Sequence, residues 1–374
     1  MKHITVIFGL AFLFLMLGLA SISEPQGSLW KGKIEHKDGV TVVSNPKNPI
    51  YRADTVKLEE ELSIGKAAGG SEYSFGRAWY IAVDDGGAIY VMDQGESCVK
   101  AYDEKGKYLR SIGRKGEGPG ELQHPNSIHL INGRRLVFED FVRSLITFST
   151  DGPFISSLST AKLMPLNILV TPNSEIVAYM NAISSGRKGK EIRLYDGQLQ
   201  FLKTLLFIPD EALDPQIIRP FTTDFHWALI QDNRLAISRH EAYEIEILDL
   251  KGASSAIFKR DHDRIKIIKA ESDEMTARVK KGLKVEIPEY HPAIQGISAD
   301  DEGHIYIKTF EITTDGASFL HDIFDREGRF LAKVPIPRTA RDLIWKNRKL
   351  YYITEDAEGF PKIKRFRVIW QLPK

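Results

Sequence analysis

The stretch WYIAVDDGGAIYVMDQGESCVKAYDEKGKYLRSIGRKGEGPGEL, residues 79–122, decides the fold because it reads as one complete structural unit. The turn sequences DDGG at 84–87 and DEKG at 103–106 combine Asp, which hydrogen-bonds its own backbone, with Gly, which takes a positive φ. Each turn joins two apolar runs, as in a β-hairpin. We therefore predict four antiparallel strands of about five residues each, the meander of one propeller blade. The four runs are residues 81–83, 89–92, 99–102 and 108–112.

The unit recurs along the chain, and an internal period of about 40 to 50 residues is typical of propellers. Copies of the first hairpin are LINGRRLVF (130–138), TPNSEIVAY (171–179), IQDNRLAIS (230–238), ADDEGHIYI (299–307) and IWKNRKLYY (344–352). The second hairpin follows each copy except the last, with Asp and Gly in the same turn. Six units predict an all-β fold, a six-bladed β-propeller of four-stranded antiparallel blades.

The sixth unit ends after its third strand, residues 362–372, which would leave a long sheet edge exposed. Proteins avoid such edges because an unpaired strand invites aggregation. Residues 55–64, TVKLEEELSI, have the pattern of a strand. We predict that this N-terminal strand closes the ring by completing the last blade.

These motifs carry a family resemblance. The pattern D-x-G-x-I-Y-V, the later F/Y-D-x-x-G-x-(Y/F)-L, and GRKGEGPGEL with Pro125 resemble the NHL-repeat six-bladed β-propeller proteins of bacterial envelopes. The match is closest over residues 79–128 and 294–335. The resemblance implies a propeller fold and a place in the envelope, and it implies no particular activity.

The chain is expected to divide into a leader, an arm and one propeller. Residues 1–23 carry an early positive charge and then an apolar run, as in a secretory signal peptide, so we expect a periplasmic or extracellular protein. An uncleaved membrane anchor is the alternative. Residues 24–53 are expected as an arm laid across the surface of the propeller, which spans 54–374. A short helix at about 270–283, beginning at Ser272, is predicted between blades 4 and 5, either to cover or plug the channel or to act as a lid.

Composition narrows the class of partner. Lys and Arg number 51 against 50 Asp and Glu, so no global field attracts nucleic acid. Cys98 is the single cysteine, which excludes an intrachain disulfide, and we expect a buried and inert thiol. We expect a monomer with no membrane span after cleavage of the leader.

Ligands of propellers usually bind at the mouth of the central channel, where polar residues that follow the second strands of the blades should form a ring. Mixed charge there suits a polar or zwitterionic ligand such as a peptide or sugar acid. A solvated rim of internal ion pairs is the alternative. The glycine-rich segment 113–120 lacks the Gly-Lys-Ser/Thr ending of a phosphate loop and is read as a connection between blades. The predicted ligand-binding residues are Asp93, Arg114, Asp140, Arg143, Asn181, Arg239, His240, Glu241, Lys308 and Glu311.

Catalytic motifs are missing from the sequence, which has no H-E-x-x-H, no Ca²⁺ loop and no G-x-S-x-G. The histidines that can face inward are His226, His240, His262 and His291, and their spacing pairs none of them. We therefore predict no catalytic residue, metal or other cofactor, and a non-catalytic binding module or scaffold for a protein, peptide or carbohydrate. The alternative is a metal-dependent lyase or lactonase with a divalent cation such as Ca²⁺ or Zn²⁺ in the channel.

Overall fold

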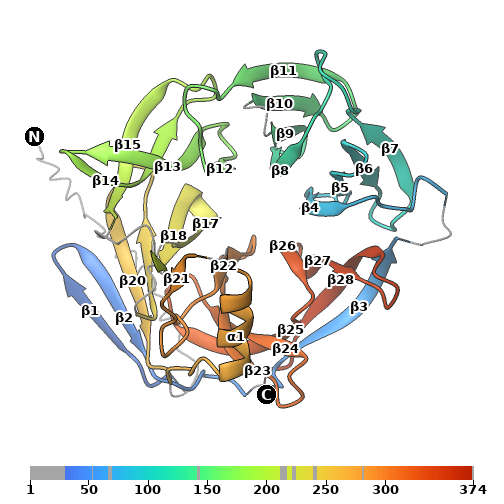
Figure 1. Ribbon diagram of the computed structural model, residues 1–374. Coiled ribbons are helices and arrows are strands. Elements are labelled where there is room, and N and C mark those ends of the chain that lie inside the picture. The colour runs from blue at the N-terminus through green and yellow to red at the C-terminus, as the bar shows by residue number, and fades with distance from the viewer. Residues whose placement is uncertain are drawn as a thin grey trace, which may run out of the picture.

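The structure, a computed structural model, describes residues 30–52, 54–65, 70–140, 144–210, 217–220, 225–238, 242–279 and 282–372. Its strands form six sheets that stand around a common centre as the blades of a propeller (Figure 1). The predicted six-bladed all-β fold is therefore confirmed. The predicted signal peptide lies outside the described residues. Within them, no helix has the length and apolar character needed to cross a membrane.

Each blade is an antiparallel meander, and four blades consist of consecutive strands alone. Blade 1 is β4 (Ala78–Val83), β5 (Ile89–Asp93), β6 (Cys98–Tyr102) and β7 (Tyr108–Ile112); blade 2 is β8 (Pro125–Ile131), β9 (Arg135–Asp140), β10 (Ser144–Ser149) and β11 (Phe154–Ser159). Blade 3 is β12 (Asn167–Val170), β13 (Ile176–Ser184), β14 (Arg187–Tyr195) and β15 (Phe201–Pro209); blade 5 is β22 (Gly296–Ala299), β23 (Ile305–Ile312), β24 (Ser318–Phe324) and β25 (Phe330–Pro337).

Blades 4 and 6 also use N-terminal strands. Blade 4 contains β17 (His226–Ile230), the 3-10 turn η1 (Gln231–Asn233), β18 (Arg234–Ser238), β19 (Glu244–Leu248) and β20 (Ser254–Arg260), with β1 (Lys33–Lys37) and β2 (Val40–Asn45) at its edge. Blade 6 contains β26 (Arg341–Lys346), β27 (Lys349–Glu355), β28 (Pro361–Trp370) and β3 (Val56–Ile64). A small parallel pair, β16 (Ile217–Ile218) and β21 (Lys284–Val285), stands apart from the blades.

The Asp-Gly turns form as predicted. In the turn between the third and fourth strands, one oxygen of the first Asp accepts the N–H groups two and four residues further on, at 2.7–3.1 Å. The Asp side chain thus accepts hydrogen bonds from backbone N–H groups that would have no partner in a tight turn. It is seen at Asp103, Asp196, Asp249 and Asp325.

Ring closure by the N-terminal strand is confirmed. β3 pairs antiparallel with β28, from Ile64 opposite Ile363 to Val56 opposite Trp370. The last blade thus obtains its fourth strand from the other end of the chain, and no long edge remains on β28.

The described part of the predicted arm forms strands at the edge of the propeller. β1 and β2 form a hairpin, and β2 pairs in parallel with β20 at the outer edge of blade 4 (Figure 1). The buried Asn45 holds it there, donating to the carbonyls of Lys259 and Gly328 at 3.0 and 2.8 Å. Its side-chain oxygen accepts the Trp30 indole N–H and the Phe330 N–H. The chain then passes β25 and enters blade 6 as β3.

The predicted helix is α1 (Lys269–Ala277), between β20 and β22. It begins three residues before the predicted start at Ser272, because the Glu271 carboxylate accepts the Ile268 N–H at 3.1 Å and caps the first turn. No residue of α1 is buried. In Figure 1 it lies in front of blade 5, to one side of the centre of the ring, so it does not plug the channel.

The blade topology gives the ring two distinct faces. The first and third turns of every blade lie on one face, which we call the turn face. The described parts of the second loops and of the connections to the next blade, including α1, lie on the other, the connection face. Between neighbouring blades lies a seam of packed apolar side chains, such as Met92 of blade 1 against Phe138 of blade 2. Polar groups at these seams and faces are the candidates for function.

Candidate functional site

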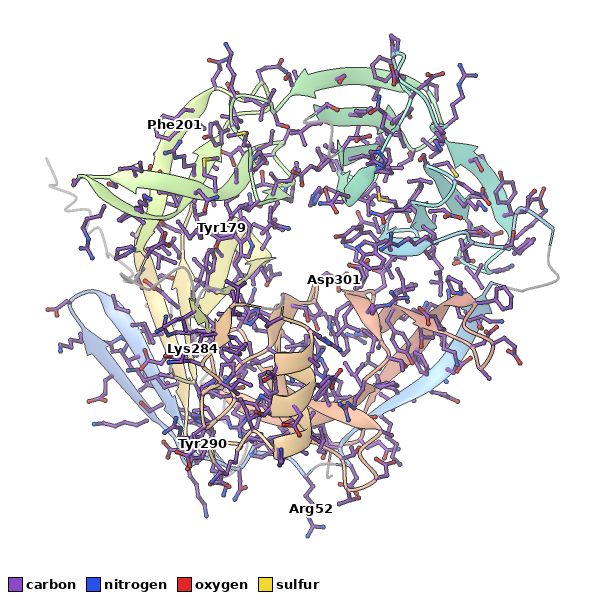
Figure 2. The ribbon with its side chains drawn as sticks, in the orientation of Figure 1. Arg52, Tyr179, Phe201, Lys284, Tyr290 and Asp301 are labelled. Carbon is purple, nitrogen blue, oxygen red and sulfur yellow. The ribbon has the colours of Figure 1, made fainter. Side chains whose placement is uncertain are left out.

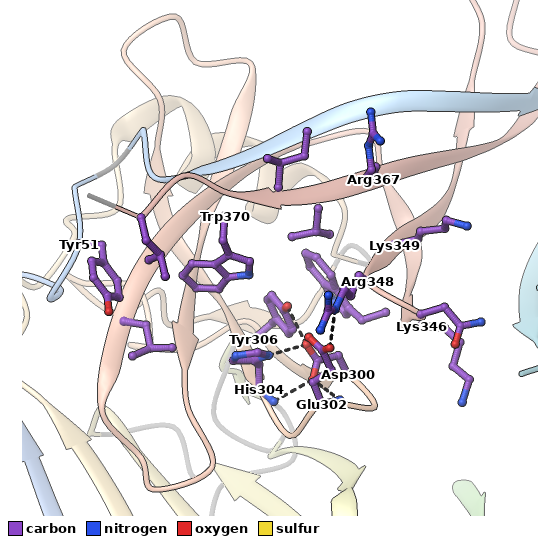
Figure 3. A pocket seen from close by; sticks show the side chains of 16 residues that line it. Tyr51, Asp300, Glu302, His304, Tyr306, Lys346, Arg348, Lys349, Arg367 and Trp370 are labelled. Atoms are coloured by element: carbon purple, nitrogen blue, oxygen red, sulfur yellow. Dashed lines mark hydrogen bonds and ion pairs between the residues drawn. The ribbon is translucent and has the colours of Figure 1, made fainter. Parts of the chain in front are cut away.

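A cavity of about 940 Å³ opens at the seam between blades 5 and 6, on the turn face (Figure 3). Blade 5 contributes the turn after β22, and blade 6 contributes the β26–β27 turn and the end of β28. Tyr51 adds an outer wall, held by its N–H, which donates to the Leu331 carbonyl at 2.8 Å. The volume is at the upper end of the range of about 300–1,000 Å³ typical of small-molecule sites. We call this cavity the 5–6 pocket.

Aromatic rings line the 5–6 pocket on two sides. The half-buried Trp370 indole meets Tyr51 edge-on, with ring centroids 6.4 Å apart, and lies over His304 at 5.7 Å and 28°. Deeper in the seam, Tyr306 stacks on Trp345 at 3.7 Å and 8°. Because these rings pack against one another, they form a rigid and flat apolar wall, with polar groups at its edge.

A hydrogen-bonded turn makes the polar part of the pocket. One oxygen of Asp300 accepts the N–H groups of Glu302 and His304 at 2.9 and 2.8 Å. The other lies 2.7 Å from His304 Nδ1 and accepts the Tyr306 hydroxyl at 3.0 Å. Burial alone would raise the pKa of Asp300 and lower that of His304. Their mutual hydrogen bond and charge outweigh burial, so the Asp300 pKa is lowered and the His304 pKa is raised.

Asp300, Glu302 and His304 also offer ligand atoms within 4.8 Å of one another, a spacing that a metal ion could use. Their atoms are already engaged. Asp300 receives four donors, His304 uses Nδ1, and Glu302 accepts Arg348 Nε at 2.6 Å. A divalent cation would have to displace several of these hydrogen bonds, so the donor set fits an internally satisfied turn better than a metal centre.

The charged side chains of the pocket rim mostly neutralise one another. Lys346 Nζ lies 2.7 Å from Asp85 and 3.5 Å from Asp301. Arg367 lies 2.5 Å from Glu59. Of the charged residues that line the pocket, Lys349 alone has no carboxylate partner in the described part of the chain. A site with paired charges and an aromatic wall favours an uncharged polar ligand over an ionic one.

The predicted channel rim contains two buried aspartates with another role. Asp93 accepts the N–H groups of Gly76 and Arg77 at 2.9 and 2.8 Å, and Asp140 accepts those of Gln123 and His124 at 2.8 and 3.0 Å. In both blades the carboxylate at the end of the second strand thus holds the chain that enters the first strand. Their predicted contact with a ligand stays a prediction.

The other predicted residues that the structure describes are scattered over the connection face. Arg114 pairs with Glu121 at 2.8 Å, and that carboxylate also accepts the Gly118 N–H, so the glycine-rich loop holds its own anion. Asn181 accepts a hydrogen bond from Lys190. Glu311 joins Arg260 and Lys333 in a cluster at the 4–5 seam. Lys308 faces the 5–6 seam. Arg143, Arg239, His240 and Glu241 lie outside the described residues.

Cys98 is buried and free, as predicted. Burial raises the pKa of its thiol to about 11, so the thiol is protonated at neutral pH and is not a nucleophile.

Sequence reasoning missed the 5–6 pocket, whose walls come from residues as distant as Tyr51, His304 and Trp370. The Asp300 carboxylate serves turn formation, as its hydrogen bonds to the Glu302 and His304 N–H groups show. One signal was present in the sequence. The turn that reads Gly87-Ala88 in blade 1 reads Gly303-His304 in blade 5, which places an imidazole where the equivalent blade has a methyl group.

Comparisons with known proteins agree with this architecture. A family model described as a six-bladed β-propeller, DUF5128, matches residues 72–269. A candidate exported protein from Bacteroides fragilis NCTC 9343 superposes with a TM-score of 0.56 at 10% identity, covering 87% of this chain and 99% of that one. A DUF4221 member from Bacteroides vulgatus ATCC 8482 superposes with a TM-score of 0.51 at 10% identity, covering 84% and 99%. A search of curated proteins finds no match to the chain.

Proposed function

The chain belongs to the DUF5128 family of six-bladed β-propellers, and on that premise we propose that it is an exported, non-catalytic binding protein whose 5–6 pocket takes an uncharged carbohydrate. The observation that carries the proposal is the combination in one pocket of an accessible aromatic wall and charges that are already paired. The resemblance to NHL-repeat envelope proteins and the N-terminal leader pattern support the exported location.

The pocket chemistry matches the two sides of a sugar ring. The C–H face of a pyranose packs on an indole, and Trp370 offers such a surface beside Tyr51. Hydroxyl groups need donors and acceptors close to that surface, and the Asp300–His304 turn and Glu302 lie next to it. Because the charges of the pocket rim other than Lys349 are paired, a neutral ligand meets little uncompensated charge there. The 940 Å³ volume leaves room for more than one sugar ring.

The test is isothermal titration calorimetry of residues 24–374 with maltotriose, cellotriose, xylotriose and the neutral peptide trialanine. We expect at least one trisaccharide to bind and Trp370→Ala to weaken it at least about tenfold, the loss of one stacking contact. Phe360→Ala is the matched control, since Phe360 is 44% exposed on the connection face of the same blade. Equal binding by wild type and Trp370→Ala, or binding of trialanine alone, contradicts the proposal.

The alternative function, a metal-dependent lyase or lactonase, makes a different prediction. A cation that binds the native state at about 100 times its dissociation constant adds about 2.7 kcal/mol to the free energy of unfolding. Thermal unfolding after EDTA treatment, and again after addition of Ca²⁺, Zn²⁺ or Mg²⁺, measures that effect. A reversible rise in the unfolding midpoint with one ion favours the enzyme, and screening with lactones would follow. An unchanged midpoint with all three ions supports the binding protein.

A further inference from the structure

Two cations of the connection face share one aromatic ring at the 5–6 seam. Lys308 Nζ lies 4.7 Å from the centroid of Phe319, and the Arg338 guanidinium carbon lies 5.1 Å from the same centroid. Lys308 belongs to β23, Phe319 to β24, and Arg338 follows β25. Three consecutive strands of a rigid blade therefore hold the two charges close together on the face opposite the 5–6 pocket.

Neither cation has a counterion among the described residues. Within the described ranges, no carboxylate lies within 4.0 Å of Lys308 Nζ or of the Arg338 guanidinium. The backbone fixes both residues, since the Lys308 carbonyl accepts the Gln295 N–H at 2.8 Å and the Arg338 N–H donates to Ala317 at 3.0 Å. Burial, and then the charge of Arg338, lowers the pKa of Lys308. Like charges held together without an anion raise the free energy of the unliganded protein.

A buried polar atom beside Lys308 also lacks a partner. His321 is paired with Lys308 across β23 and β24 and is 2% exposed. Its Nδ1 donates to the Phe319 carbonyl oxygen at 3.4 Å, which leaves Nε2 as an acceptor with no hydrogen-bond partner among the described residues. Buried polar atoms are rarely left unsatisfied in native proteins, so Nε2 marks a place where a donor, such as a hydroxyl group of the ligand or a water molecule, is expected beside the two cations.

The same blade shows what a completed lysine site looks like. Lys333 of β25 contacts Glu311 and lies 3.8 Å from Asp322. Among the described residues, two carboxylates therefore lie beside one half-buried lysine of blade 5 and none beside the other. The missing negative charge at Lys308 is the one that a ligand would bring.

We propose that Lys308 and Arg338, which both approach the Phe319 ring, form a binding site for an oxyanion group, a carboxylate, sulfate or phosphate carried by a soluble ligand. Lysine supplies a point charge, and the planar guanidinium supplies paired N–H donors that match two oxygens. The aromatic ring fixes both cations in place and excludes water from one side. The site lies on the connection face and is independent of the carbohydrate pocket on the turn face.

The probes are trigalacturonate for carboxylates, a heparin tetrasaccharide for sulfates and inorganic phosphate, each titrated into residues 24–374 by calorimetry. The test variant is K308M/R338M. Its matched control, R187M/K188M, removes the same charge from the exposed start of β14 in blade 3. We expect at least one probe to bind the wild type, a loss of about tenfold or more in the test variant, and a change of less than about twofold in the control. Which probe binds tells the source of the oxyanion.

Two results would overturn the proposal. One is no binding of any probe to the wild type at millimolar concentrations. The other is an equal loss in both double variants, which would make the binding a general effect of net charge. Thermal unfolding without a probe provides the folding control. Because the cations lack an anion, K308M/R338M should unfold at the wild-type temperature or above it, and a large fall would indicate a structural role instead.

Discussion

The two seams that flank blade 5 treat buried charge in opposite ways. At the 4–5 seam, Arg260 of blade 4 bridges Asp322 and Glu311 of blade 5, with Lys333 beside them and the Tyr243 hydroxyl donating to Asp322. At the 5–6 seam, Lys308 and Arg338 stand without a carboxylate among the described residues, and a large pocket opens on the opposite face. Figure 2 shows how densely side chains fill the blades around both seams.

This difference suggests that one seam holds the blades together and the other binds a ligand. At the 4–5 seam both cations have carboxylate partners, and the cavity there holds only about 10 Å³. Such a cluster holds two blades together and leaves little room for a ligand. The 5–6 seam has an apolar wall, an empty cavity and two unpaired cations among the described residues. These features are available to a ligand. We therefore locate binding at the 5–6 seam and mechanical cohesion at the 4–5 seam.

The largest expected effect comes from breaking the 4–5 cluster. Asp322→Ala leaves the 2%-exposed Arg260 side chain without its buried partner, so the free energy of unfolding should fall by about 3–5 kcal/mol. Chemical denaturation measures the change. Asp263→Ala, which removes the exposed partner of Lys47, is the control and should cost less than about 1 kcal/mol. A loss below about 1 kcal/mol for Asp322→Ala would show that the 4–5 cluster does not hold the two blades together.

The comparison is sharpest between the two lysines of blade 5. Lys333→Met removes a cation that two carboxylates need and should cost about 2 kcal/mol of unfolding free energy. Lys308→Met removes a half-buried charge with no anion and should leave stability unchanged or increase it by about 1 kcal/mol. Denaturant titration of both variants under the same conditions measures the two changes, and each variant serves as the control for the other. Equal losses would show that the two seams do not differ.

A smaller effect is expected from pH at the pocket. The folded His304 pKa is above its ordinary 6.5, so its contribution to stability is complete below 6.5 and is lost as pH rises through the folded value. The folded Asp300 pKa is below its ordinary 3.8, so its contribution is present above 3.8 and is lost as pH falls through the folded value. The pair therefore stabilises the fold most between those two ordinary values.

His304→Gln should cost about 1 kcal/mol at pH 5.5 and less at pH 8.5, as measured by denaturation at both values. His36→Gln, in the exposed strand β1, is the control for the replacement of an imidazole by an amide outside the pocket. An equal cost of His304→Gln at both pH values would mean that the imidazole acts by packing on Trp370 and not by its charge.

The fold was predictable because its determinants are local and repeated. The Asp-Gly turns, the spacing of the apolar runs and the missing fourth strand of the last unit each lie within a short stretch of sequence. The 5–6 pocket depends on which blades become neighbours and on how Tyr51, His304 and Trp370 meet, which no local pattern reports. Lys308 was singled out from its place after a second strand. That no carboxylate among the described residues reaches Lys308 depends on how blades 5 and 6 pack together, which the sequence pattern does not show.

Two details show how tertiary contacts override local signals. Residues 24–53 were expected as an arm laid across the surface, and Asn45 ties the described part to blades 4 and 5 through three hydrogen bonds, to Lys259, Gly328 and Phe330. Asp93 and Asp140 looked like exposed rim residues, yet backbone N–H groups of the incoming strands bury them. In both cases the partner is distant in sequence.

The most direct test of the central claim is a crystal structure of the protein soaked with the trisaccharide that binds most tightly in calorimetry. We expect a sugar ring in the 5–6 pocket, packed on Trp370, with hydroxyl groups in contact with the Asp300–His304 turn. A sugar bound elsewhere, such as at the mouth of the central channel, with the 5–6 pocket left empty, would contradict it.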